Sequence, residues 1–218
     1  QKEAHHSLFE IVENSYLGPF LDAQLPSLKL TVRDFFCCWL ILKDWSSALI
    51  KSIKNFEMNR RGDIGKLAPQ VSVAEIVRVL AAGTGLPEAQ LEKLLPIIVV
   101  DPTNLGDCFK QGCWYRPLVQ VNENRVVFLL ATLEVADPVY VLERLFAATN
   151  LHMQIENNSL GVAYESAVRK SLTESCKKNK FLHDTFVSNS GVDFSNEGGE
   201  EIDLLIRCKS VVMVVELK

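Results

Sequence analysis

The chain ends in the stretch EEIDLLIRCKSVVMVVELK, residues 200–218, and this stretch decides the fold of the C-terminal part. Two apolar runs flank residues 208–210, a segment short enough to be a tight turn, so they predict the two strands of a β-hairpin. Strands this apolar should be buried. The charged residues near the hairpin's open end therefore need a reason: Asp203, Glu216 and Lys218.

Hairpin geometry brings these three charged residues together. In a hairpin that turns near residue 209, the start of the first strand lies beside the end of the second. Strand alternation places Glu216 and Lys218 on one face and Leu217 on the other. We therefore expect two carboxylates, those of Asp203 and Glu216, and one ammonium group to converge at one end of a sheet.

Such a grouping has a chemical use. Two carboxylates supply the hard oxygen ligands that Mg²⁺ prefers, and Mn²⁺ can substitute for it. The metal stabilises charge on a phosphoryl group and lowers the pKa of a bound water, while a nearby lysine can orient that water. The alternative, from the residues alone, is a hairpin whose charged end is simply exposed to solvent.

The same residues resemble the catalytic motif of the PD-(D/E)XK nuclease superfamily, in its restriction-endonuclease-like and nuclease-related branches. Asp203 is followed, after twelve residues, by Glu216-Leu217-Lys218, on two apolar β-runs. An upstream helix of the family's type is expected over 159–178, where the matching positions are Gly161, Glu165, Val168 and Leu172. The resemblance covers about residues 158–218.

The resemblance implies a Mg²⁺-dependent nuclease that hydrolyses phosphodiester bonds, with DNA as the expected substrate. Asp203 and Glu216 would bind the metal, with the Leu217 carbonyl as a third ligand, Lys218 would position the water, and Glu165 would complete the site. The family's core continues beyond the lysine, so we expect the core in 156–218 to be incomplete. RNA cleavage and endo- against exonuclease action stay open, as does a catalytically inactive scaffold.

A basic stretch follows Glu165 along the expected helix. It could hold a phosphate backbone, and a solvated helix end is an equally good interpretation. Its members are Arg169, Lys170, Lys177, Lys178 and Lys180. The segment 180–188 is expected to form a strand.

Residues 1–155 predict a mostly helical domain with a β-hairpin near 115–133, so the whole chain is expected to combine this domain with an α/β nuclease-like core. A long helix should begin after Thr31 and bury one face: Phe35, Phe36, Trp39 and Leu40. Two short helices within 72–95 could form a helix-turn-helix. The second is acidic, however, which favours a packing unit over a DNA reader.

Composition limits the other classes of function. The 218 residues carry a formal net charge of −4, which excludes a protein that is basic all over. The six cysteines form no CxxC pairs, so we expect reduced thiols and a cytoplasmic location. No apolar run is long enough to span a membrane, and the sequence shows no charged-then-apolar signal peptide. The first residue is Gln1 and not Met, so we expect the chain to be cut at its start. A homodimer or larger complex stays open.

Overall fold

The computed structural model divides the chain into two compact units, residues 1–154 and 155–218, which are described separately. The expected domain boundary lay at residue 155. The residues that the structure describes are 2–26, 28–53, 65–104, 115–151, 159–180, 182, 184–188, 192–193, 201–202 and 204–215. None of the described helices is long and apolar enough to cross a membrane.

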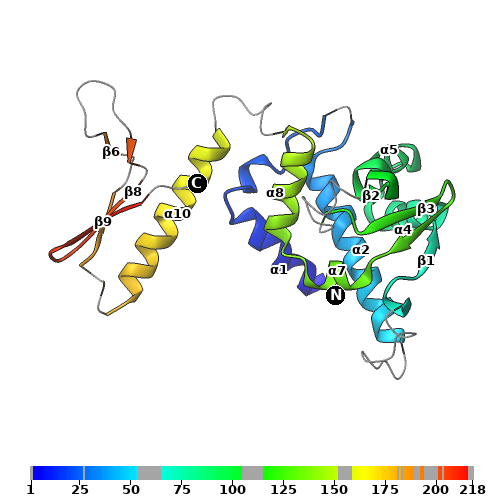
Figure 1. The fold of residues 1–218 in the computed structure, drawn as a ribbon, viewed down its shortest axis with the longest axis horizontal. Helices are drawn as coiled ribbons and strands as arrows, with labels where there is room; N and C mark the ends of the chain where they lie inside the picture. The colour runs from blue at the N-terminus through cyan, green and yellow to red at the C-terminus, as the bar shows by residue number, and fades with distance from the viewer. Residues whose placement is uncertain are drawn as a thin grey trace. The chain divides into compact units, whose positions relative to one another are not determined.

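Helices dominate the first unit (Figure 1). In chain order they are α1 (Lys2–Glu13), η1 (Gly18–Phe20), α2 (Val32–Ser52), η2 (Gly65–Leu67), α4 (Val73–Thr84), α5 (Glu88–Ile98), η3 (Pro102–Asn104), α7 (Leu130–Val135) and α8 (Pro138–Ala148). Helix α2 contacts α4 and α7, and α1 contacts α8, so the core of this unit gathers around α2.

The start and the buried face of α2 follow from its sequence. The Thr31 side chain accepts a hydrogen bond from the Asp34 N–H, and the Asp34 carboxylate accepts one from the Thr31 N–H, which completes a capping box. The four residues expected in the core are all buried, and the rings of Phe36 and Trp39 stack with centroids 5.9 Å apart. Burial of each such side chain stabilises the fold by about 1.5–3 kcal/mol.

The first unit also contains a four-stranded mixed sheet, which goes beyond the single hairpin expected. Its order is β1 (Gln70–Ser72), β4 (Arg125–Phe128), β3 (Leu118–Asn122) and β2 (Val99–Val100), with β2 parallel to β3. The β3–β4 hairpin is confirmed, but it ends at Phe128, because the apolar residues after it continue into α7. A continuous apolar run does not distinguish a strand from a buried helix by periodicity.

Helices α4 and α5 pack against each other as a structural pair. The Ser72 side chain accepts a hydrogen bond from the Glu75 N–H at the start of α4. Gly85 ends that helix with φ +74°, a left-handed conformation that glycine adopts without strain. Helix α5 buries Leu91, Leu94 and Ile98, as expected of a packing unit.

The second unit consists of helix α10 and short strands (Figure 1). Helix α10 spans Ser159–Lys178, as predicted, and the strands are β5 (Phe186–Val187), β6 (Val192–Asp193), β7 (Glu201–Ile202), β8 (Leu204–Cys208) and β9 (Val211–Val215). Strands β5, β8 and β9 form an antiparallel sheet in that order, and β6 pairs with β7. The prediction of a strand over 180–188 is wrong for the residues before β5. Backbone hydrogen bonds from Leu182 to Asn179 and from Thr185 to Leu182 form turns there.

The sheet β5-β8-β9 has an inner face, part of which packs on α10, and an outer face that does not. The expectation that the apolar strands of the hairpin are buried is wrong for β9, because Val211 to Val214 are 48–60% exposed on both faces. Among the described residues, Leu172 and Val215 pack against a small core that Cys176 of α10 forms with three residues of the inner face: Val187, Leu204 and Ile206. The outer face carries the alternate residues of the same strands, which the pairing register places in rows: Phe186, Leu205, Arg207, Val212 and Val214.

Candidate functional site

The predicted metal site belongs to the open end of the β8–β9 hairpin. The two strands pair from Cys208 opposite Val211, beside the turn, to Leu204 opposite Val215. This is the hairpin that the sequence predicts, with a two-residue turn. The four predicted site residues that follow on from its open end lie outside the residues that the structure describes: Asp203, Glu216, Leu217 and Lys218.

Glu165 is the one predicted catalytic residue that the structure describes. It lies on α10 and is part-buried, with its carboxylate 3.2 Å from the Arg169 guanidinium. Helical spacing places both residues on the face of α10 that carries Leu172 and Cys176, which is the face packed on the sheet. Glu165 is therefore held by a neighbouring cation within a partly buried setting.

The basic residues predicted to contact nucleic acid separate into two groups. Arg169 pairs with Glu165 and is part-buried, whereas the others are exposed: Lys170, Lys177, Lys178 and Lys180. Lys177 and Lys178 directly follow Cys176 in the last turn of α10, so they lie twelve and thirteen residues beyond Glu165 along the helix. Twelve helical residues rise about 18 Å. These lysines thus belong to a different part of the helix from Glu165.

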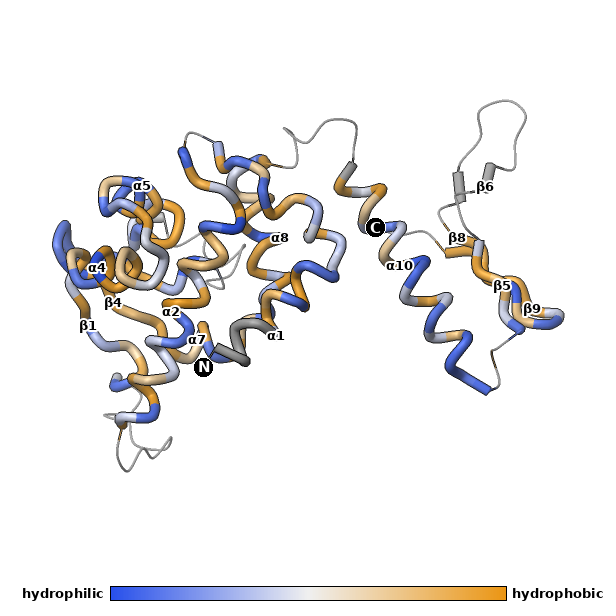
Figure 2. The backbone as a smooth tube through the Cα atoms, turned by 180° about the vertical axis from the view of Figure 1, so that it is seen from behind, coloured by the Kyte–Doolittle hydropathy of each residue, from blue (hydrophilic) through white to orange (hydrophobic). Residues whose placement is uncertain are grey.

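Two further cations were missed by the sequence reasoning. Arg207 lies on β8 and Lys209 in the β8–β9 turn, and both are exposed. Among the described residues, neither has an ion-pair partner. Figure 2 shows the hydrophobic strands β8 and β9 running into this hydrophilic turn. The signal was present in the sequence, as two cations interrupting an otherwise apolar hairpin.

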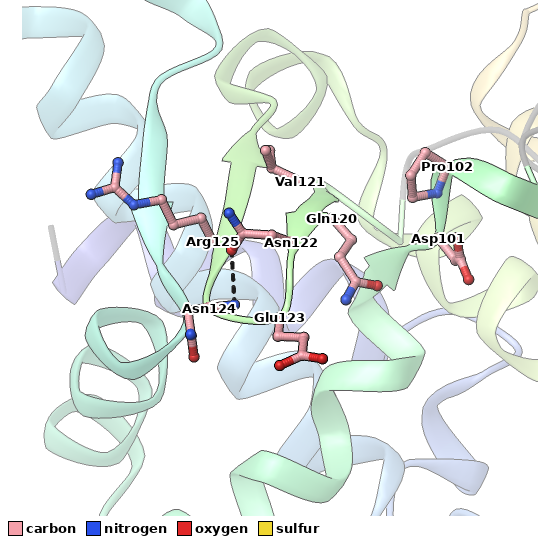
Figure 3. Close-up of a pocket in the computed structure, with 8 residues that line it drawn as sticks. All are labelled: Asp101, Pro102, Gln120, Val121, Asn122, Glu123, Asn124 and Arg125. Atoms are coloured by element: carbon pink, nitrogen blue, oxygen red, sulfur yellow. Dashed lines mark hydrogen bonds between the residues drawn. The ribbon is translucent and has the colours of Figure 1, made fainter.

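A separate groove lies in the first unit, beside the β3–β4 hairpin. A cavity of about 760 Å³ is lined by residues 101–102 and 120–125, and a second one of about 380 Å³ adjoins it over an apolar floor that includes Leu95 and Val99. In Figure 3, the amide of Gln120 lies between the carboxylates of Asp101 and Glu123. Hydrogen bonds from the Thr103 side chain and backbone lower the pKa of Asp101.

This groove is open, and it is lined by the carboxylates of Glu92, Asp101 and Glu123 together with the Arg125 guanidinium. Within the described parts of the chain, no group of three His, Cys, Asp or Glu side chains is close enough to hold a metal ion. The sequence marks Asp101 only as the start of a turn, and the groove forms because β2 brings that turn beside β3. Its carboxylates come from segments distant in sequence.

None of the described cysteines is fully exposed to solvent. Cys38 and Cys176 are buried, whereas Cys37 and Cys208 are half-buried, and all four are free. Burial raises the pKa of the Cys38 thiol to about 12, which disfavours the nucleophilic thiolate. Cys108 and Cys113 lie outside the described residues.

Comparison with known proteins adds no family. No protein-family model matches the chain, and no curated protein or solved structure is significantly similar to it.

Proposed function

We propose that the chain is a metal-dependent nuclease whose active site lies at the open end of the β8–β9 hairpin. The observation that carries this proposal is the pairing of Leu204 with Val215. If the antiparallel register continues by one residue, Asp203 falls opposite Glu216, with both side chains on the same face of the sheet. Two carboxylates at opposite positions of an antiparallel pair can share one divalent cation.

The chemistry follows from this placement. Mg²⁺ is the expected ion, held by the Asp203 and Glu216 carboxylates and the Leu217 carbonyl. When bound, it supplies charge stabilisation at a phosphodiester and an acidified water. Lys218 is two residues beyond Glu216 and therefore shares its face in a regular strand, so its ammonium group can orient the water or neutralise the developing charge.

Glu165 has a less direct part in the proposal. Regular alternation places residues 203 and 216 on the outer face, because their neighbours Leu204 and Val215 belong to the inner face. Glu165 is on the helix that packs on that inner face. It can reach the same metal only if the strands depart from regular alternation at their open end, as a β-bulge allows. The variant Glu165→Gln decides this: a loss of metal affinity assigns it to the site.

DNA is the proposed substrate, and the cytoplasm is the proposed location. The exposed cations of the second unit provide local positive charge in a chain that is acidic overall. The four described cysteines are free thiols, which suits a reducing compartment.

The test is cleavage of end-labelled DNA by the whole chain with Mg²⁺ or Mn²⁺, with an EDTA control. Wild type should cut, and Glu216→Gln should lose on the order of 100-fold in rate, because the amide keeps the shape but gives up the charge that holds the cation. Lys218→Ala should lose activity while still binding Mn²⁺. Glu174→Gln is the matched control, because it neutralises an exposed carboxylate of α10.

The control variant should keep wild-type activity. If neither DNA nor RNA is cut and no metal binds, the nuclease proposal fails. The inactive, nuclease-like scaffold then becomes the better interpretation of the same fold.

A further inference from the structure

We infer that the outer face of the sheet β5-β8-β9 binds single-stranded nucleic acid, with a base stacked on Phe186 and phosphates held by Arg207 and Lys209. This inference rests on the proposed function, since it names the form of substrate that the proposed active site would receive.

The outer face carries an exposed aromatic ring beside a cation. Phe186 on β5 is opposite Arg207 on β8, which is in turn opposite Val212 on β9, so the three side chains form one row across the sheet. Phe186 is 51% exposed and Val212 is 54% exposed. An exposed phenylalanine costs solvation free energy unless a ligand covers it, and the flat face of a nucleobase covers it well.

Charge complementarity selects an anionic occupant. Arg207 sits between two apolar residues of the row and has no ion-pair partner among the described residues. An apolar protein layer placed over this row would bury an unpaired guanidinium, which is strongly unfavourable. A nucleic-acid strand brings a phosphate to pair with the guanidinium and a base to cover the ring.

The backbone conformation of Lys209 is independent support for a ligand contact at the hairpin turn. The turn between Cys208 and Val211 has two residues, and Lys209 adopts φ +53° in it. Asparagine and glycine are the residues that favour this conformation in a hairpin turn, whereas a lysine is strained there. A strained residue at an exposed tip points to a use for its side chain, and here the side chain adds a second cation beside Arg207.

The outer face also connects to the proposed active site. Along the same face, the row of Phe186 is followed by Leu205 opposite Val214, and regular pairing predicts residues 203 and 216 in the row after that. Four strand residues span about 13 Å. A single strand lying along this face would therefore lead from the Phe186 row to the proposed metal site, whereas a stacked duplex would keep its bases away from the ring.

The experiment measures binding without cleavage. Fluorescence anisotropy of a labelled 20-nucleotide single strand, and of the matching duplex, is followed in EDTA over a range of KCl concentrations. We expect tighter binding of the single strand. Phe186→Leu should weaken it on the order of ten-fold, because it removes the ring but keeps an apolar side chain, whereas Phe186→Tyr should retain binding.

The charged variants have their own signatures. The slope of log affinity against log salt is negative, and Arg207→Gln and Lys209→Asn should each reduce its magnitude by about 0.7. This is the value for one phosphate contact on a single strand. Lys209→Asn should also raise the thermal midpoint of the second unit by a few degrees, because it relieves the turn while removing the charge. Lys93→Gln, an exposed lysine of α5 in the first unit, is the matched control and should change neither quantity.

The inference is overturned if Phe186→Leu binds the single strand as wild type does, or if no nucleic acid binds at low salt. It is also overturned if the three substitutions weaken binding to vesicles containing phosphatidylserine but leave single-strand binding unchanged, because the face would then be a lipid-binding surface. Binding in EDTA without any cleavage in Mg²⁺ would instead reject the proposed function and leave this face assigned. Cleavage of DNA in Mg²⁺, together with wild-type single-strand binding by Phe186→Leu, would reject this face as the binding surface and leave the proposed function standing.

Discussion

Leu204→Ala should selectively destabilise the second unit, and this tests the strand register on which the proposed site depends. Leu204 is fully buried, and among the described residues its core has three other buried members: Cys176, Val187 and Ile206. Removing a buried leucine side chain costs about 2–5 kcal/mol, depending on how far the cavity collapses. A unit of about 60 residues has a total stability on the order of 3–9 kcal/mol. The substitution therefore removes a large share of that stability.

Hydrogen exchange measured by mass spectrometry separates the two units. Peptides from α10, β8 and β9 should lose most of their protection in Leu204→Ala, whereas those from α2 should not change. Tryptophan fluorescence during urea unfolding gives an independent reading of the first unit alone, since Trp39, Trp45 and Trp114 all lie there. The fluorescence midpoint should therefore stay at the wild-type value.

Val214→Ala is the matched control. Val214 is 60% exposed on the outer face, so its truncation should change stability by no more than about 0.5 kcal/mol. A slip of one residue in the register would exchange the two faces and reverse the two results. Normal protection in Leu204→Ala together with loss in Val214→Ala would refute the register and the placement of residues 203 and 216.

Three further predictions concern the described parts of the first unit. Asp137→Ala should destabilise it by about 1 kcal/mol in urea unfolding, because the Asp137 carboxylate accepts hydrogen bonds from two backbone N–H groups that begin α8, and an unchanged midpoint would reject the cap. The side-chain hydrogen bond from Arg33 lowers the pKa of Asp22. The ionised carboxylate therefore stabilises the fold at pH values above its ordinary pKa, and this contribution is lost as the pH falls through the pKa of the folded state. Arg33→Gln should return the pKa of Asp22, followed by NMR titration, to its usual range. Cys38 should resist iodoacetamide at pH 8 until the chain is denatured, as mass spectrometry of the modified peptides can show, and rapid labelling of the native protein would contradict its burial.

Local signals in the sequence predict the helices well. Helix α2 begins after Thr31 because a threonine followed three residues later by an aspartate can satisfy the first free N–H groups. Helix α8 begins with Asp137 followed by Pro138 for the same kind of reason. The core face of α2 follows from apolar spacing, since a 21-residue helix repeats its pattern several times.

Structure that depends on distant partners could not be predicted in the same way. Strand β2 has only two residues and exists because it pairs in parallel with β3, far along the chain. The apolar residues of α7 suit a strand or a helix equally, and contact with α2 decides between them.

The second unit likewise has features that local sequence patterns predict and features that depend on strand pairing. The β8–β9 hairpin, its turn and helix α10 could be anticipated from alternation and from helical spacing. The outer-face row of Phe186, Arg207 and Val212 could not, because it depends on the pairing of β5 with β8. Cross-strand neighbours are set by register, which a single sequence specifies only through its buried face.

Metal binding is the most direct test of the central claim. Electron paramagnetic resonance of Mn²⁺ titrated into the whole chain counts bound ions without requiring any substrate. The proposal predicts one site at which Mg²⁺ competes, with affinity lost in both Asp203→Asn and Glu216→Gln and kept in Lys218→Ala, since lysine is not a ligand. Absence of bound Mn²⁺ in the wild-type chain, or the same affinity in Glu216→Gln, would contradict a metal site at the open end of the β8–β9 hairpin.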